Sequence, residues 1–155
     1  QVVGFTPDRD YKYLEVNQFL RRLHPEIVGR TERMIAEVGG AVVRDPASDL
    51  LTVNREFTVS LVLSRCQLLD NDRRRWKVRF DTSLTPDITV AVRLDDTNQS
   101  PLDYYLLPRL DFGRPRVQGG IHLADHNGLE LESYRFDTLD GLYGMAERSR
   151  IRRAA

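Results

Sequence analysis

Three cations alternate along one short segment of the chain, with a spacing that suits contact with phosphates. Residues 73–79 read RRRWKVR, and Arg75, Lys77 and Arg79 alternate there with apolar side chains. Side chains two residues apart on a strand project from the same face about 7 Å apart. Such a row can follow a phosphate backbone, although a solvated face neutralised by Asp and Glu is the simpler alternative. The predicted nucleic-acid contacts are Arg73, Arg74, Arg75, Lys77 and Arg79, with Arg150, Arg152 and Arg153 as a second patch at the C-terminus.

Carboxylates at strand ends suggest a different chemistry. The aspartates at or near predicted strand ends are Asp81, Asp87, Asp95, Asp96 and Asp103. Pro86-Asp87 before a strand resembles the first half of the PD-(D/E)XK nuclease motif. That resemblance implies a Mg²⁺ site completed by a second acid and a lysine on the next strand. Asp103 stands at the acid position, but Tyr105 occupies the lysine position, so the motif is broken.

Two readings of these carboxylates therefore stay open. One is a divergent metal-dependent nuclease that uses Asp87 and Asp103, with Glu26 or Glu32 contributed by a neighbouring helix. The other is that the aspartates stabilise turns or form surface ion pairs with arginines.

Other reactive residues lack the partners that their chemistry requires. His122 and His126 are four residues apart, but glycines on both sides predict a loop, and no third ligand is evident. We predict no metal site there. Cys66 is the only cysteine, which excludes an internal disulfide and suits a reducing, cytoplasmic location. The sequence contains no glycine-rich phosphate loop and no G-x-S-x-G segment.

The totals indicate one ordinary globular domain. The chain has 155 residues, of which 41% are apolar and 30% charged, and its formal net charge is zero. No apolar run approaches the ~18 residues of a membrane span. The first residue is Gln1 rather than methionine, so we expect that an N-terminal part was removed or that the sequence is a piece of a larger chain, whose other domains would then be partners.

The apolar periodicity predicts the elements that position these residues. Spacings of three and four residues from Asp10 onward predict two helices, separated at His24-Pro25. Alternation predicts a sheet of about six strands, in which residues 75–111 form an antiparallel meander with one wet face rich in Arg and Asp. The predicted class is a single α+β domain with a mostly antiparallel sheet. Its parts are an irregular segment at 1–9, helices at 10–38, the sheet at 41–111, an irregular segment at 112–136 and a closing helix at 137–150.

Four blocks of the sequence resemble a known kind of module. They are NREFTVSLVLSRC (54–66), PDITVAVR (86–93), PLDYYLLPRLD (101–111) and ESYRFDTLDGLYGMAERSRI (132–151). Together they resemble a C-terminal accessory module of bacterial recombinase-type mobile-element proteins. This resemblance implies a DNA-linked accessory module rather than a cutting domain, with no catalytic residue and no cofactor.

A third hypothesis concerns protein partners. The aromatic block containing Tyr104 and Tyr105, together with the closing helix, could form an interaction or homo-oligomerisation surface. Light scattering of the isolated domain separates a monomer from a self-associating form.

Overall fold

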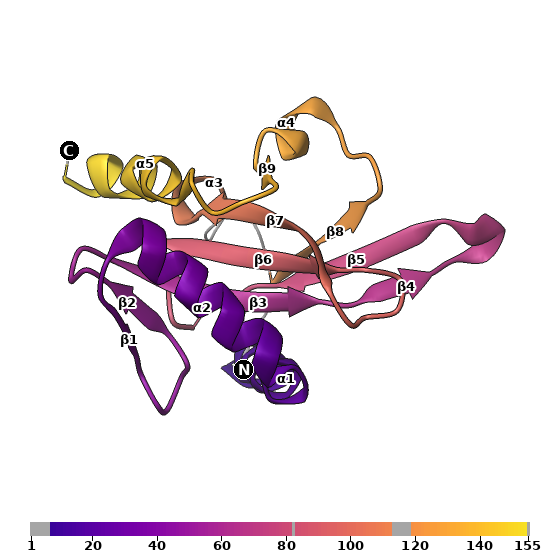
Figure 1. Ribbon diagram of the computed structural model, residues 1–155, viewed down its shortest axis with the longest axis horizontal. Coiled ribbons are helices and arrows are strands. Elements are labelled where there is room, and N and C mark those ends of the chain that lie inside the picture. The colour runs from indigo at the N-terminus through magenta and orange to yellow at the C-terminus, as the bar shows by residue number, and fades with distance from the viewer. Residues whose placement is uncertain (1–6, 82, 113–118, 155) are drawn as a thin grey trace.

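The computed structural model describes residues 7–81, 83–112 and 119–154, and the side chains of residues 13–149 within those ranges. Within these ranges the chain forms a helical layer, a six-stranded mixed sheet and a smaller three-stranded sheet (Figure 1). The predicted α+β class, with two N-terminal helices and a closing helix, is confirmed.

The two N-terminal helices meet at a proline. Helix α1 spans Pro7–Leu23 and α2 spans Pro25–Gly39. His24 adopts a non-helical φ of −130°, because the residue before a proline is excluded from the helical region. Gly40 then ends α2 with a φ of 94°, which a residue without a Cβ adopts without strain. Helix α1 begins three residues before the predicted Asp10, and residues 1–6 lie outside the described ranges.

The large sheet has the strand order β1-β2-β3-β6-β7-β9. Its strands are β1 (Val42–Arg44), β2 (Leu51–Val53), β3 (Phe57–Ser64), β6 (Ile88–Leu94), β7 (Pro101–Pro108) and β9 (Arg135–Phe136). Strands β3 and β6 are parallel and the other neighbours are antiparallel. The predicted β1–β2 hairpin and β6–β7 hairpin are both present.

The small sheet corrects the predicted meander. It consists of β4 (Cys66–Leu68), β5 (Arg74–Arg79) and β8 (Gly120–Ala124), all antiparallel. Strand β5 pairs with β4 and β8, and not with β6 as predicted. The chain thus leaves the large sheet after β3 and returns at β6, and such a crossover is what parallel pairing requires.

The segment predicted to be irregular also contains regular structure. Between residues 112 and 136 the chain forms β8, a short helix α4 (Leu129–Glu132) and β9, while another short helix, α3, spans Arg109–Phe112. Residues 113–118 lie outside the described ranges.

The closing helix packs on the helical side of the large sheet. Helix α5 spans Leu142–Ala154, so it begins five residues later than predicted. Leu142 and Ala146 are buried in the same core as α2, and Tyr143 Oη donates a hydrogen bond to the Gly39 carbonyl at 2.7 Å. Helices α2 and α5 therefore pack on one face of the large sheet, and the small sheet packs on the other face. These two helices do not cover the outer side of the small sheet. None of the helices in the described ranges combines the length and apolar character needed to cross a bilayer.

The face of the large sheet that was predicted to be wet is buried beneath the small sheet. Trp76, Val78 and Leu123 of the small sheet pack there against residues of β3, β6 and β7. Arg93 of β6 lies between the two sheets with only 2% of its surface exposed. The alternation predicted for β6 is correct, but the polar side of this strand faces the small sheet instead of solvent.

Arg93 makes this burial possible by satisfying its charge internally. Its Nε and Nη2 donate to the two carboxylate oxygens of Asp103 on β7, at 2.8 and 2.7 Å. Its Nη1 donates to the Ala124 carbonyl of β8 at 2.6 Å. The guanidinium also stacks 4.3 Å from the Trp76 ring and 5.3 Å from the Tyr105 ring. One side chain therefore joins β6, β7, β8 and β5.

We predict that Asp103→Ala destabilises the fold strongly. The substitution removes the main counter-charge of a buried guanidinium, and breaking one side of such a pair costs about 3–5 kcal/mol. Urea unfolding followed by tryptophan fluorescence measures the loss. Asp96→Ala is the matched control, since Asp96 is exposed and its removal should change stability by less than about 0.5 kcal/mol. Equal, small losses in both variants would contradict the structural role of Asp103.

Candidate nucleic-acid interface

Strand β5 divides its side chains between a core and an open face. Trp76 and Val78 are fully buried between the sheets. Arg75, Lys77 and Arg79 have the opposite parity and point to the outer side, where each is partly exposed. The predicted row of three cations on one strand face is therefore present, and Trp76 anchors the core as the alternation indicated.

The neighbouring strands add no negative charge to this outer side. Gln67 of β4 lies opposite Arg75 and accepts a hydrogen bond from its Nη2 at 3.0 Å. On β8, Ala124, His122 and Gly120 lie opposite Arg75, Lys77 and Arg79 respectively. We call Arg75, Lys77, Arg79 and His122 the basic face. Among the side chains that the structure describes, none of its three permanent cations forms an ion pair.

A groove of about 380 Å³ lies at one end of the basic face. Cationic and imidazole side chains supply much of its lining: Arg73, Arg74, Arg75, His122 and His126. The groove extends the row of β5 toward the β8 turn, where Asp125 also lines it.

The five predicted hairpin contacts separate into two groups. Arg73 is exposed at the start of the strand, and Arg75, Lys77 and Arg79 follow on the outer side. Arg74 instead has the parity of Trp76. Its Nε donates to Asp125 at 2.9 Å, and its guanidinium lies 5.1 Å from the Trp76 ring. Because Arg74 is already neutralised, we assign it a structural role.

The second predicted patch falls at the end of α5. The side chains of Arg150, Arg152 and Arg153 lie outside the described residues. Their neighbour Arg148 forms an ion pair with Asp111 at 2.7 Å and lies 5.6 Å from the Tyr134 ring.

Helix α1 holds the far end of the basic face in place. Lys77 Nζ lies 5.7 Å from the Tyr13 ring of α1. One turn further, Asn17 Nδ2 donates to the Arg79 carbonyl at 2.8 Å and to the Asp81 carboxylate at 2.6 Å. These contacts attach α1 to the last residues of β5 and to the turn that follows.

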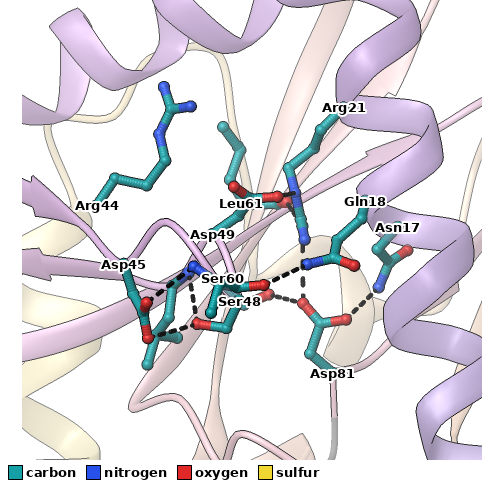
Figure 2. A network of polar contacts seen from close by, with 12 residues as sticks. Asn17, Gln18, Arg21, Arg44, Asp45, Ser48, Asp49, Ser60, Leu61 and Asp81 are labelled. Atoms are coloured by element: carbon teal, nitrogen blue, oxygen red, sulfur yellow. Dashed lines mark hydrogen bonds and ion pairs between the residues drawn. The ribbon is translucent and has the colours of Figure 1, made fainter.

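Asp81 is the centre of a buried polar network that connects α1 with both sheets. Figure 2 shows its carboxylate with Asn17 on one side and Ser60 of β3 on the other. Arg21 Nη1 lies 3.7 Å from the same carboxylate and donates to the Leu61 carbonyl at 2.6 Å. Burial raises the pKa of Asp81, while hydrogen bonds from its neighbours and the Arg21 charge act in the opposite direction.

A larger hollow of about 540 Å³ lies between α1, α2 and the β1–β2 turn. Its walls carry opposite charges that are already paired: Arg21 with Asp49 at 3.4 Å, and Arg44 with Glu32 through a two-pronged contact. This hollow therefore has a more balanced charge than the basic face, although Arg22 also lines it.

The structure does not bring together the two acids of the nuclease alternative. Asp87 directly precedes Ile88, which pairs with Pro108, whereas Asp103 pairs with Arg93 near the other end of the β6–β7 ladder. At about 3.4 Å per residue these carboxylates lie on the order of 20 Å apart. Asp87 instead accepts hydrogen bonds from the Thr58 backbone and hydroxyl.

The two glutamates of that alternative lie on α2, and the two histidines considered separately lie on or next to β8. Glu32 binds Arg44 on the helical side of the sheet, and Glu26 is exposed on α2. His122 lies on β8 and His126 in the turn that follows, not on a helix. In the described ranges, no group of three or more His, Cys, Asp or Glu side chains is placed to hold a metal ion.

Cys66 is partly buried in the fold, and Tyr104 and Tyr105 are buried in it. The Cys66 thiol is partly buried, and burial raises its pKa, which lowers its reactivity as a nucleophile. Tyr104 and Tyr105 lie in the two cores, and Tyr105 Oη accepts a hydrogen bond from Asn127 at 2.9 Å. Both tyrosines are buried within the domain, so they do not belong to a surface that a partner protein could contact. An interaction surface on the closing helix stays a prediction.

Sequence reasoning missed His122 as a member of the face. Gly119 and Gly120 favoured a loop, yet Ile121 and Leu123 alternate with His122 as a strand requires. Strand β8 is short, and its partner β5 is some forty residues earlier in the chain. Only the pairing of these strands places the imidazole beside Lys77.

Comparison of this chain with protein-family models, with curated proteins and with solved structures gives no match. The fold and the site thus define its class by geometry alone: an α+β domain of two packed sheets, one of which carries a partly exposed row of three cations.

We predict that Asp81→Ala destabilises the domain by about 3 kcal/mol, because it leaves the buried Ser60 hydroxyl and Asn17 amide without the acceptor that Asp81 provides. The folded-state pKa of Asp81 lies above its unfolded value of 3.8. Its stabilising contribution is therefore largest below that value and declines as pH rises through the folded pKa. The difference in unfolding free energy between wild type and variant should be larger at pH 4 than at pH 7.

Urea unfolding at the two pH values tests this sign. Asp96→Ala serves again as the control, since an exposed carboxylate should give no comparable trend. If Asp81→Ala lowers the unfolding free energy more at pH 7 than at pH 4, Asp81 stabilises the fold as a carboxylate, contrary to the effect of its burial.

Proposed function

We propose that this domain is a non-catalytic, DNA-associated module of a larger bacterial DNA-handling protein of the recombinase kind. It contacts the phosphate backbone through the basic face and the adjoining exposed Arg73. The single observation that carries the proposal is the row of three cations on β5, which has no carboxylate partner among the described side chains.

The neutral total charge is compatible with this proposal because the charges are distributed unevenly. Described carboxylates such as Asp49, Asp103 and Asp111 pair with arginines inside the domain or at its edges. The basic face therefore retains a local positive potential that the sum over the chain conceals. A local patch of this kind attracts a polyanion even when the protein as a whole is neutral.

The geometry supports backbone contact rather than base readout. The cations project from a strand in a sheet, at intervals of about 7 Å. They lie on a strand and not on a helix of the kind that enters the major groove. Phosphate contacts fix position and orientation but carry no sequence information, so binding should be nearly independent of DNA sequence.

The cellular context is part of the proposal. The half-buried free thiol of Cys66 suits a reducing, cytoplasmic environment. The resemblance to an accessory module of mobile-element proteins supports DNA as the polyanion and a larger chain as the setting. The cutting chemistry would then belong to another part of that chain.

We predict that replacing Arg75, Lys77 and Arg79 together by glutamine weakens DNA binding and reduces its salt dependence. Each phosphate contact contributes about −0.9 to the slope of log K against log salt, so the slope should become less steep by about three. Fluorescence anisotropy of a labelled duplex, titrated at several salt concentrations between 50 and 200 mM, measures both effects. Two duplexes of unrelated sequence should respond alike.

The matched control replaces three exposed helical cations, Arg22, Arg30 and Arg33, by glutamine. This triple variant has the same net charge as the first but keeps the basic face, so its slope should match that of wild type. If both triple variants lose DNA affinity equally, binding depends on the overall charge of the protein and not on the basic face. If wild type fails to bind at 50 mM salt, the proposed function is wrong.

A further inference from the structure

His122 occupies the centre of the basic face. It lies on β8 directly opposite Lys77, and its side chain is exposed on the outer side of the small sheet. Side chains at directly opposed positions of an antiparallel pair have Cβ atoms about 5 Å apart, and diagonal neighbours are still within reach of long side chains. Arg75 and Arg79 are these diagonal neighbours.

The charges that face His122 are all positive. Strand β5 contributes Arg75, Lys77 and Arg79, and these cations, together with burial as the largest cause, lower the pKa of the imidazole below its usual 6.5. On its own strand the same-side neighbours are Ala124 and Gly120, and the nearest α1 side chain known to contact the face is Tyr13 at Lys77. In the adjoining turn, Asp125 is held by Arg74 and His126 lines the groove.

We propose that His122 is a fourth phosphate contact of the basic face, which becomes available by taking up a proton when a phosphate backbone docks on the row. The inference rests on the proposed function, because it needs a polyanion on the same surface. It adds the prediction that binding consumes about one proton.

The physical reason is that a bound phosphate reverses the field at the imidazole. In the free domain three cations oppose its protonation. A phosphate chain lying across Arg75, Lys77 and Arg79 neutralises them and places anionic oxygens beside the ring. An opposite charge at about 4–6 Å favours the protonated form, and the imidazolium then donates a charge-assisted hydrogen bond to a phosphate oxygen.

Linkage gives the sign of the pH dependence. Below the free-state pKa of His122 the ring is already protonated, so affinity is highest and flat. Between the free-state and bound-state pKa values, affinity falls as pH rises, with a slope of log K against pH that approaches −1. Above the bound-state pKa the ring is neutral in both states, and affinity is flat again at a lower level.

The same proton changes the salt dependence. With the imidazole protonated, the basic face contacts phosphates with four cations in place of three. The slope of log K against log salt should therefore be steeper by about 0.9 at low pH than at pH 8.

The test is anisotropy of a labelled duplex at pH values from 5 to 8, with wild type, His122→Gln, His126→Gln and His122→Arg. His126→Gln is the matched control, since His126 lines the groove but is not opposite Lys77. We expect the pH dependence to be retained in His126→Gln and abolished in His122→Gln. The permanent cation of His122→Arg should keep affinity at its low-pH level up to pH 8.

A second readout follows protonation directly. The chain has three histidines, so His→Gln variants assign all of their ring resonances. NMR titration should show the pKa of His122 rising when the duplex is added, and that of His24 unchanged.

The outcomes separate the two proposals. Salt-sensitive binding whose pH dependence persists in His122→Gln, or an unchanged His122 pKa with DNA bound, would overturn the inference and leave the proposed function intact. Absence of salt-sensitive binding at every pH would overturn the proposed function, and the inference with it.

Discussion

The structure depends on one buried cation. Arg93 projects from the large sheet into the space between the sheets, where Asp103, the Ala124 carbonyl and two aromatic rings surround it. A guanidinium is suited to this position because its planar fork binds a carboxylate with two hydrogen bonds while its faces stack on rings. The contact with Trp76 places the apolar side of β5 against the large sheet. By the alternation of a strand, the other side of β5, with its three cations, must then face outward.

A second constraint is the way in which the domain distributes its charges. Arginine outnumbers lysine heavily, and several arginines are bound to carboxylates within the fold, including Arg21, Arg74 and Arg148. These pairs neutralise the acids involved, and the positions of β4 and β8 opposite Arg75, Lys77 and Arg79 carry no carboxylate. Net charge is consequently a poor guide to the potential at any one surface of this protein, and the arrangement of its ion pairs is a better one.

Local patterns in the sequence predicted what local physics determines. His24-Pro25 predicted the helix boundary, and the alternation around Trp76 predicted which side of β5 faces the core. The pairing of β5 with β4 and β8 could not be predicted, because a half-buried strand has the same period whichever strand lies beside it. For the same reason the burial of Arg93 was missed: alternation identifies a polar side but not what covers it. The separation of Asp87 from Asp103 likewise depends on the register of β6 with β7.

The position of the basic face on a sheet also affects how it can bind. Arg75, Lys77 and Arg79 extend from a strand held on both sides, with Trp76 and Val78 fixed in the core beneath. The backbone beneath the cations is thus already ordered, so that docking restricts only their side chains and the associated loss of entropy is small. Helix α1 strengthens this support, since Asn17 links the end of β5 to the buried Asp81 network. A rigid row of this kind favours contacts that repeat along a regular backbone, and it offers little means of adapting to individual bases.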